Sequence, residues 1–191
     1  MIATNSLRGG HKRRMLCWAG MVCALLFVPL GAITVNDLLA ETRMTPRRFA
    51  NHFEDFTFQA FPYVQDPDVF LKTANGCCQD YAILGSFVLN HDKFETHLVR
   101  VLLVGGEAHD VCYVTQTGTY LDYNLRGFFV NTKHSGRRLM EIAAKVAASF
   151  DENWTSASEF TYTYADDMKR LTVTVVKTDP PSEDPDAKEG S

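Results

Sequence analysis

The sequence lacks an excess of positive charge. Its 191 residues include 19 Lys and Arg against 23 Asp and Glu, a net charge of −4. Four of the bases and none of the acids lie in residues 1–32, so residues 33–191 carry 15 bases against 23 acids and a net charge of −8. Nucleic acids and anionic membranes are bound by basic surfaces. The composition therefore argues against either as a partner.

The sequence has no internal repeat and only one long apolar run, and its length suits one domain with flanking segments. The run, Met15 to Ala32, follows four basic residues and ends in the small pair Gly31-Ala32. A basic stretch followed by an apolar run and small residues is typical of an export signal. We predict that residues 1–32 are a signal peptide or an uncleaved signal anchor. The protein is then periplasmic or secreted, with membrane contact only if the segment is uncleaved.

Cysteines are few, and only Cys77, Cys78 and Cys112 lie outside the predicted signal. An odd number in an oxidising compartment leaves at least one thiol free or intermolecular. A Cys77–Cys112 disulfide and a strained Cys77–Cys78 bond both stay open. Adjacent cysteines lack the Cys-x-x-Cys spacing of zinc sites, which disfavours a metal site made of both cysteines and His109. No metal or cofactor is predicted.

The apolar pattern predicts an α+β fold. Helical patterns cover most of Val35 to Phe61, then Pro67 to Leu71, Cys78 to His91 and Arg138 to Phe150; strand-like runs are His97 to Val104, Ala108 to Thr115, Thr119 to Asn124, Phe160 to Tyr164 and Leu171 to Val176. Short connections between the first three strands require antiparallel pairing. We therefore expect a buried helix packed on an antiparallel sheet, in a domain of residues 33–176. Residues 177–191, with three Pro and five acids, are predicted to be a disordered tail.

A thiol, an imidazole and a carboxylate follow one another in the order that a nucleophilic cysteine site uses. Cys78 comes just after the Asn75-Gly76 turn, at the predicted start of a helix, where the helix dipole favours a thiolate. A backbone N–H there can also serve an oxyanion hole. His109 opens one strand and Asp122 lies in the next. Antiparallel pairing of these strands therefore brings the two residues within one or two positions of each other in register. In such a site the His takes the thiol proton and the Asp orients the His.

Two of these assignments have rivals within the sequence. Cys77 competes with Cys78, although the pattern Gly-x-Cys-x-Asp-Tyr-Ala selects Cys78. His97 competes with His109, because it also opens a strand. Taken alone, a small buried cysteine or a surface histidine is more often structural, so the assignment depends on the three residues together.

The residues around the nucleophile have predicted supporting roles. Asp80 lies two positions after Cys78 and is predicted to be a structural carboxylate, bonded to backbone or to an arginine. Gln59 and Gln65, upstream of the turn, are candidates for a second oxyanion donor.

The motifs Gly76-Cys77-Cys78-Gln79-Asp80-Tyr81-Ala82, His109-Asp110-Val111 and Leu121-Asp122 resemble those of the transglutaminase-like superfamily of papain-like fold. That pattern is Gly-x-Cys-x-Asp-aromatic-Ala, then a His that opens a strand, then an Asp on the next strand. The resemblance covers roughly Pro67 to Asn124. It implies a papain-like core with Cys78 as nucleophile, His109 as base and Asp122 as the residue that orients the base.

Within that superfamily the motifs are also similar to those of the bacterial transglutaminase-like cysteine proteinases of the periplasm. Those proteins read Asp-Cys-Glu-Asp-Tyr-Ala around the nucleophile and bind calcium through nearby acids. Here Cys77 and Gln79 stand at the two flanking positions. The sequence departs from the calcium-binding pattern at both.

The expected function is that of an exported thiol hydrolase, which cleaves an amide or peptide bond of a peptide or protein through a Cys78 acyl-enzyme. The alternative is a catalytically inactive domain used for binding or assembly. The Cys77-Cys78 pair, the missing second oxyanion donor and the small size of the chain favour this alternative.

Overall fold

The computed structural model describes residues 33–124 and 132–178. The predicted export signal and most of the predicted tail lie outside these residues. In chain order the elements are α1 (Val35–Ala40), α2 (Pro46–Asn51), β1 (Thr57–Phe58), α3 (Pro67–Thr73), β2 (Asn75–Gly76), α4 (Cys78–His91), β3 (Thr96–Leu103), β4 (Ala108–Val114), β5 (Thr119–Leu121), β6 (Thr132–His134), α5 (Leu139–Ala148), β7 (Trp154–Thr161) and β8 (Arg170–Val176). None of the helices within these two ranges is long and apolar enough to cross a membrane.

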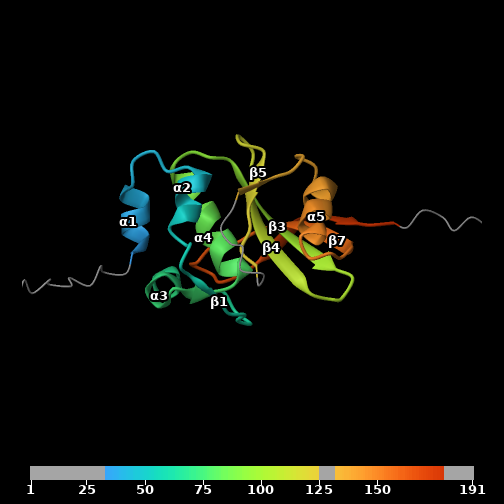
Figure 1. Cartoon of the computed structure of the whole chain (residues 1–191), viewed down its shortest axis with the longest axis horizontal. Coiled ribbons are helices and arrows are strands. Elements are labelled where there is room, and N and C mark those ends of the chain that lie inside the picture. Colours follow the sequence, from blue (N-terminus) through green and yellow to red (C-terminus); the bar gives the residue numbers. More distant parts are fainter. Residues whose placement is uncertain (1–32, 125–131, 179–191) are drawn as a thin grey trace, which may run out of the picture. The chain divides into compact units, whose positions relative to one another are not determined.

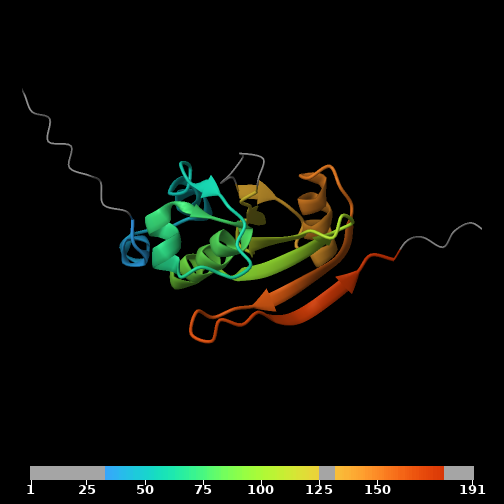
Figure 2. The ribbon, with the colours of Figure 1, turned by 90° about the horizontal axis from the view of Figure 1, so that it is seen from below.

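The centre of the fold is a six-stranded sheet in the order β6-β5-β4-β3-β7-β8, in which every neighbouring pair is antiparallel. Strands β3, β4 and β5 form the predicted meander, and their antiparallel pairing is confirmed. Strands β1 and β2 form a separate, parallel pair. Figure 2 shows the long β7–β8 hairpin along one edge of the sheet.

Helices cover both faces of this sheet. Successive residues of a strand point to opposite faces, and β4 follows this rule. Cys112 and Val114 belong to the core around α4, whereas Val111 and Tyr113 belong to the core around α5. Figure 1 shows α5 on one side of the sheet and α1 to α4 on the other. The predicted α+β fold with a buried helix on an antiparallel sheet is confirmed.

Helix α4 is buried along most of its length, because apolar residues occupy more than one of its faces. It begins as predicted at Cys78, with Cys77 as its N-cap. Gly85 lets it lie close to the sheet, since a Cβ there would come within 2.6 Å of Leu121 Cδ1. This close packing fixes the helix that carries Cys78 against the strands that carry its proposed partners.

The prediction of a mostly helical segment from Val35 to Phe61 is wrong. The segment holds two short helices, α1 and α2, and then extends into β1. Pro46 begins α2, and a residue before proline is disfavoured in the helical conformation. Thr45 instead caps α2, accepting the Arg48 N–H at 3.2 Å. Phe49 is buried and lies in α2, the helix that begins after this cap.

Strand β7 begins at Trp154 rather than at the predicted Phe160, and β6 was not predicted. The start of β7 contains Ser156, Ala157 and Ser158, which have little intrinsic preference for strands. It becomes a strand because it pairs with β3 on one side and with β8 on the other.

Candidate active site

Cys78 is the first residue of α4, where backbone N–H groups have no acceptor within the helix. The glycine before it is required by packing. A Cβ at Gly76 would lie 2.5 Å from the Phe70 ring and 3.0 Å from Asp80 Oδ2. The Gly-x-Cys part of the motif therefore lets the chain enter the helix beside a buried ring and a buried carboxylate.

His109 and Asp122 lie together, as the strand pairing predicts. The imidazole Nε2 lies 2.7 Å from Asp122 Oδ1, and both side chains are buried. Asp122 comes directly after β5, which pairs with β4. The Phe150 ring packs against the imidazole at a centroid distance of 4.8 Å. When Nε2–H donates to the carboxylate, Nδ1 of the neutral imidazole is left as an acceptor.

Asp122 is held as a carboxylate by the imidazole of His109 and the ammonium of Lys133. Burial by itself would raise the pKa of Asp122, but the hydrogen bond from His109, its charge and the nearby Lys133 outweigh burial and hold the pKa below the usual value. The Lys133 ammonium donates to Asp122 Oδ2 at 2.7 Å. Sequence reasoning missed Lys133, because it lies on β6, a strand of three residues that has no clear pattern.

One cavity of about 400 Å³ is lined by both Cys78 and His109. Its lining is Phe58, Ala60, Phe61, Pro62, Cys77, Cys78, Gln79, Arg100, Leu103, Glu107, Ala108, His109, Asp110, Asn124 and Phe150. The rival His97 does not line this cavity. Its Nε2 lies 3.4 Å from Glu95 Oε1 and its Nδ1 lies 3.5 Å from Glu159 Oε2. The structure therefore brings together Cys78 and His109, with Asp122 behind the imidazole.

Cys77 is buried beside Cys78, at 4% exposure. The Cys77 thiol donates to Asp80 Oδ2 at 3.3 Å. The Cys78 thiol hydrogen-bonds to Cys77; this bond, burial and the negative charge of Asp110 raise the pKa of Cys78 well above its usual value. The sequence led us to expect a lowered pKa for Cys78 at the helix start, but these neighbours raise it. Both cysteines and Cys112 are free thiols, so neither disulfide is formed.

Replacing Cys77 with Ala is expected to speed the alkylation of Cys78 by iodoacetamide several-fold at neutral pH. The substitution removes the acceptor that holds the Cys78 proton, and the thiolate is the reactive form. The rate at Cys78 is measured by mass spectrometry of the peptide that contains it, with Cys112→Ala as the control. An unchanged rate in Cys77→Ala would show that the thiol pair does not control Cys78.

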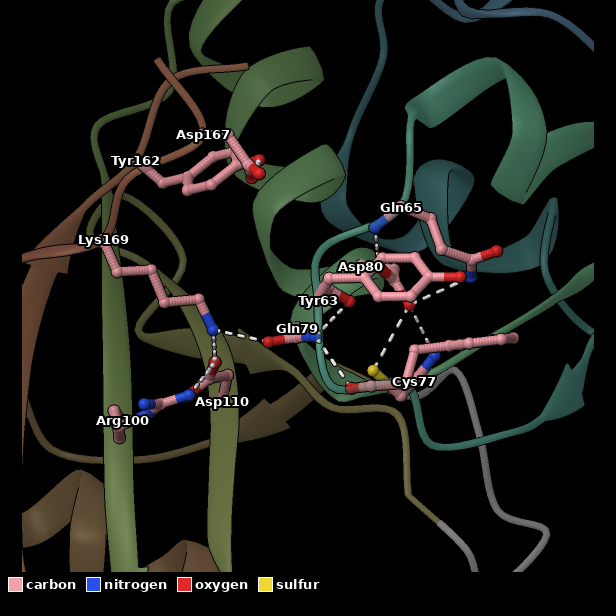
Figure 3. A network of polar contacts seen from close by, with 11 residues as sticks. Tyr63, Gln65, Cys77, Gln79, Asp80, Arg100, Asp110, Tyr162, Asp167 and Lys169 are labelled. Carbon is pink, nitrogen blue, oxygen red and sulfur yellow. Dashed lines mark hydrogen bonds and ion pairs between the residues drawn. The ribbon is translucent and has the colours of Figure 1, made fainter. Parts of the chain in front are cut away.

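Asp80 organises the turn before α4, as Figure 3 shows. Its carboxylate accepts the backbone N–H groups of Gln65 at 2.7 Å and Cys77 at 2.9 Å. The predicted structural role of Asp80, bonded to backbone, is present, and no arginine of residues 33–124 or 132–178 bonds to this carboxylate. The Gln65 amide donates to Asp80 and to Asn75 O. Neither Gln65 nor Gln59 lines the cavity, so the prediction that one of them is an oxyanion donor is not supported.

Asp80→Asn is expected to lower the free energy of unfolding by about 3 kcal/mol, because a buried carboxylate that accepts several hydrogen bonds is replaced by an amide that presents hydrogens to the same donors. Urea denaturation measures the change. Asp55→Asn, at an exposed aspartate, is the matched control and is expected to change stability by less than about 0.5 kcal/mol. Equal stabilities of the two variants would contradict this role of Asp80.

The residues around Cys78 do not fit a calcium ion. Calcium takes six or more oxygen ligands, several of them carboxylates. The two flanking side chains are a thiol and the amide of Gln79, whose oxygen accepts from the Lys169 ammonium at 2.7 Å. Within residues 33–124 and 132–178, no three His, Cys, Asp or Glu side chains are grouped to hold a metal ion.

The family profile described as "Transglutaminase-like domain" matches residues 37–144, a range that contains Cys78, His109 and Asp122. No curated protein matches the chain. Among solved structures, calcium-bound Legionella pneumophila LapG is similar at 16% identity, with a TM-score of 0.42, over 64% of this chain and 68% of that chain. EGTA-treated LapG from the same organism is similar at 17% identity, with a TM-score of 0.41, over 64% and 67%.

Proposed function

Because the chain belongs to the transglutaminase-like family, we propose that it is an exported thiol hydrolase that cleaves an amide or peptide bond of a peptide or protein. The observation that supports this most directly is the shared cavity. Cys78 and His109 line it, and the 2.7 Å contact to Asp122 fixes the imidazole. The basic stretch and the apolar run Met15 to Ala32 support export.

In the proposed first step, Cys78 attacks the carbonyl carbon of the scissile bond. His109 Nδ1 takes the thiol proton as the C–S bond forms, which suits a cysteine that is protonated at rest. The imidazolium then gives this proton to the leaving amine, the C–N bond breaks, and a thioester remains on Cys78. Asp122 stabilises the imidazolium and keeps the ring in the correct tautomer.

In the proposed second step, water resolves the thioester. His109 removes a proton from the water as its oxygen attacks the carbonyl carbon. The C–S bond then breaks, the departing Cys78 thiolate takes the proton from the imidazolium, and the acyl group leaves as a carboxylic acid. In this proposal the backbone N–H of Cys78, in the first turn of α4, stabilises the oxyanion in both steps.

A library of short peptides with a C-terminal fluorogenic amide tests the proposal. We expect release of the fluorophore by the wild-type protein and, after acid quench, an acyl group on Cys78 detected by mass spectrometry. Neither is expected for His109→Ala. The cavity wall of Phe58, Phe61 and Phe150 favours an apolar side chain next to the scissile bond, so such peptides should react fastest.

A catalytically inactive binding domain is the second candidate, and one observation favours it. The raised pKa of Cys78, caused by its bond to Cys77, by burial and by Asp110, disfavours the thiolate in the resting protein. Under this alternative the wild-type protein binds peptides from the library, forms no acyl group on Cys78 and releases no more fluorophore than His109→Ala.

A further inference from the structure

A single ammonium group joins the two residues that follow the proposed nucleophile and the proposed base. Lys169 Nζ donates to Gln79 Oε1 and to Asp110 Oδ2, each at 2.7 Å. Gln79 follows Cys78 in α4, and Asp110 follows His109 in β4. Figure 3 shows the lysine side chain reaching both from the segment before β8. Three parts of the chain that are distant in sequence therefore meet at one atom.

The bridge is partly buried, and its Asp110 end is fully buried. The Lys169 side chain is 19% exposed and that of Asp110 is 2% exposed. The ammonium also lies 5.4 Å from the centre of the Phe160 ring. Asp110 accepts a second cation, Arg100, whose Nε lies 2.9 Å from Oδ1. Water and salt screen a partly buried ion pair less than an exposed one, so the ammonium holds these partners more firmly than a surface pair would.

Gln79 extends the bridge to the wall of the cavity. Its Nε2 donates to the carbonyl oxygens of Tyr63 at 2.6 Å and Phe61 at 3.2 Å. Residues 60–62 line the cavity. With its oxygen facing Lys169, the amide must turn its nitrogen toward these carbonyls, so the lysine also sets the orientation of Gln79.

We propose that Lys169 is a positioning residue for this site: its ammonium fixes the first turn of α4 relative to β4, and with them the approach of Cys78 to His109. This inference rests on the proposed function. Lys169 does not line the cavity, so it acts through Gln79 and Asp110 and not on the reacting atoms. The lysine ammonium carries three N–H donors on one atom, so it can donate to both oxygens at once.

Lys169→Met removes the donors and keeps a side chain of similar length. Small displacements of reacting groups reduce rates strongly, so we expect kcat for peptide hydrolysis to fall about 30- to 100-fold, with KM within about threefold of wild type. Lys169→Arg keeps charge and donors and is expected to recover most of the loss. Hydrogen–deuterium exchange is expected to increase in residues 59–66, because the Gln79 amide is no longer oriented.

Lys177→Met is the matched control. Lys177 flanks the other end of β8, where its Nζ lies 3.1 Å from Asn153 Oδ1 and 6.0 Å from the centre of the Trp154 ring. It thus has an amide oxygen and an aromatic ring as partners, like Lys169, but no contact with α4 or β4. We expect wild-type kcat and exchange in this variant. If Lys169→Met does not fold, Gln79→Met breaks the same bridge from its other end and should produce the same loss.

The outcomes separate this inference from the proposed function. An active wild type with unchanged kcat and unchanged exchange in Lys169→Met overturns the positioning role. An inactive wild type with increased exchange in residues 59–66 of Lys169→Met overturns the proposed hydrolysis and supports the bridge. An inactive wild type without that increase overturns both.

Discussion

Cys78→Ala is expected to lower kcat for peptide hydrolysis by at least about 10⁴-fold, since removal of the nucleophile leaves only binding and oxyanion stabilisation. Cys77→Ser is the matched control. A serine hydroxyl can still donate to Asp80, as the Cys77 thiol does at 3.3 Å. Serine is also a favoured N-cap residue, so α4 keeps its start. We expect activity within about tenfold of wild type for Cys77→Ser.

This pair of variants decides which of two adjacent thiols reacts. The measurement is kcat with the fluorogenic peptide, accompanied by thermal unfolding of each variant. If Cys77→Ser loses as much activity as Cys78→Ala while both stay folded, the assignment of the nucleophile is wrong.

Asp122→Asn is expected to lower kcat by about 10³- to 10⁴-fold, with the fold retained. The carboxylate accepts from His109 Nε2, so Nδ1 is free to receive the thiol proton. An amide nitrogen in the same place would turn the imidazole to the tautomer that carries its proton on Nδ1, where it cannot act as a base. Kinetics with the fluorogenic peptide measure the loss, and a kcat within threefold of wild type would contradict the orienting role.

The same carboxylate links stability to pH. The pKa of Asp122 is below its usual value because the His109 hydrogen bond and the charges of His109 and Lys133 outweigh burial. A lowered pKa in the folded state contributes stability above the unfolded pKa of about 3.9, and this contribution is lost as the pH falls through the folded pKa. The stability difference between wild type and Asp122→Asn should therefore be largest at neutral pH and shrink below about pH 4 in urea denaturation.

Much of the fold was predictable because its information is local. The apolar residues after Cys78 predict a buried helix, and the short connections between β3, β4 and β5 permit only antiparallel pairing. Where local preference and tertiary pairing disagree, prediction failed. Ser156 to Ser158 form part of β7 only because β3 and β8 flank them. By contrast, the Thr45-Pro46 helix start is a local signal, and it is present as the N-cap and first residue of α2.

By itself, the sequence determined the order and types of the proposed catalytic groups, Cys78, His109 and Asp122, because motif spacing and strand register are short-range properties. Only the tertiary structure decided what surrounds them. The hydrogen bond to Cys77, burial and the charge of Asp110 raise the pKa of the proposed nucleophile Cys78, and Lys169, 90 residues from Gln79 in sequence, joins α4 to β4. No spacing rule predicts such contacts. Hydrogen bonds and the interactions between charges depend on distances between atoms, and these distances are set only when distant segments have packed together.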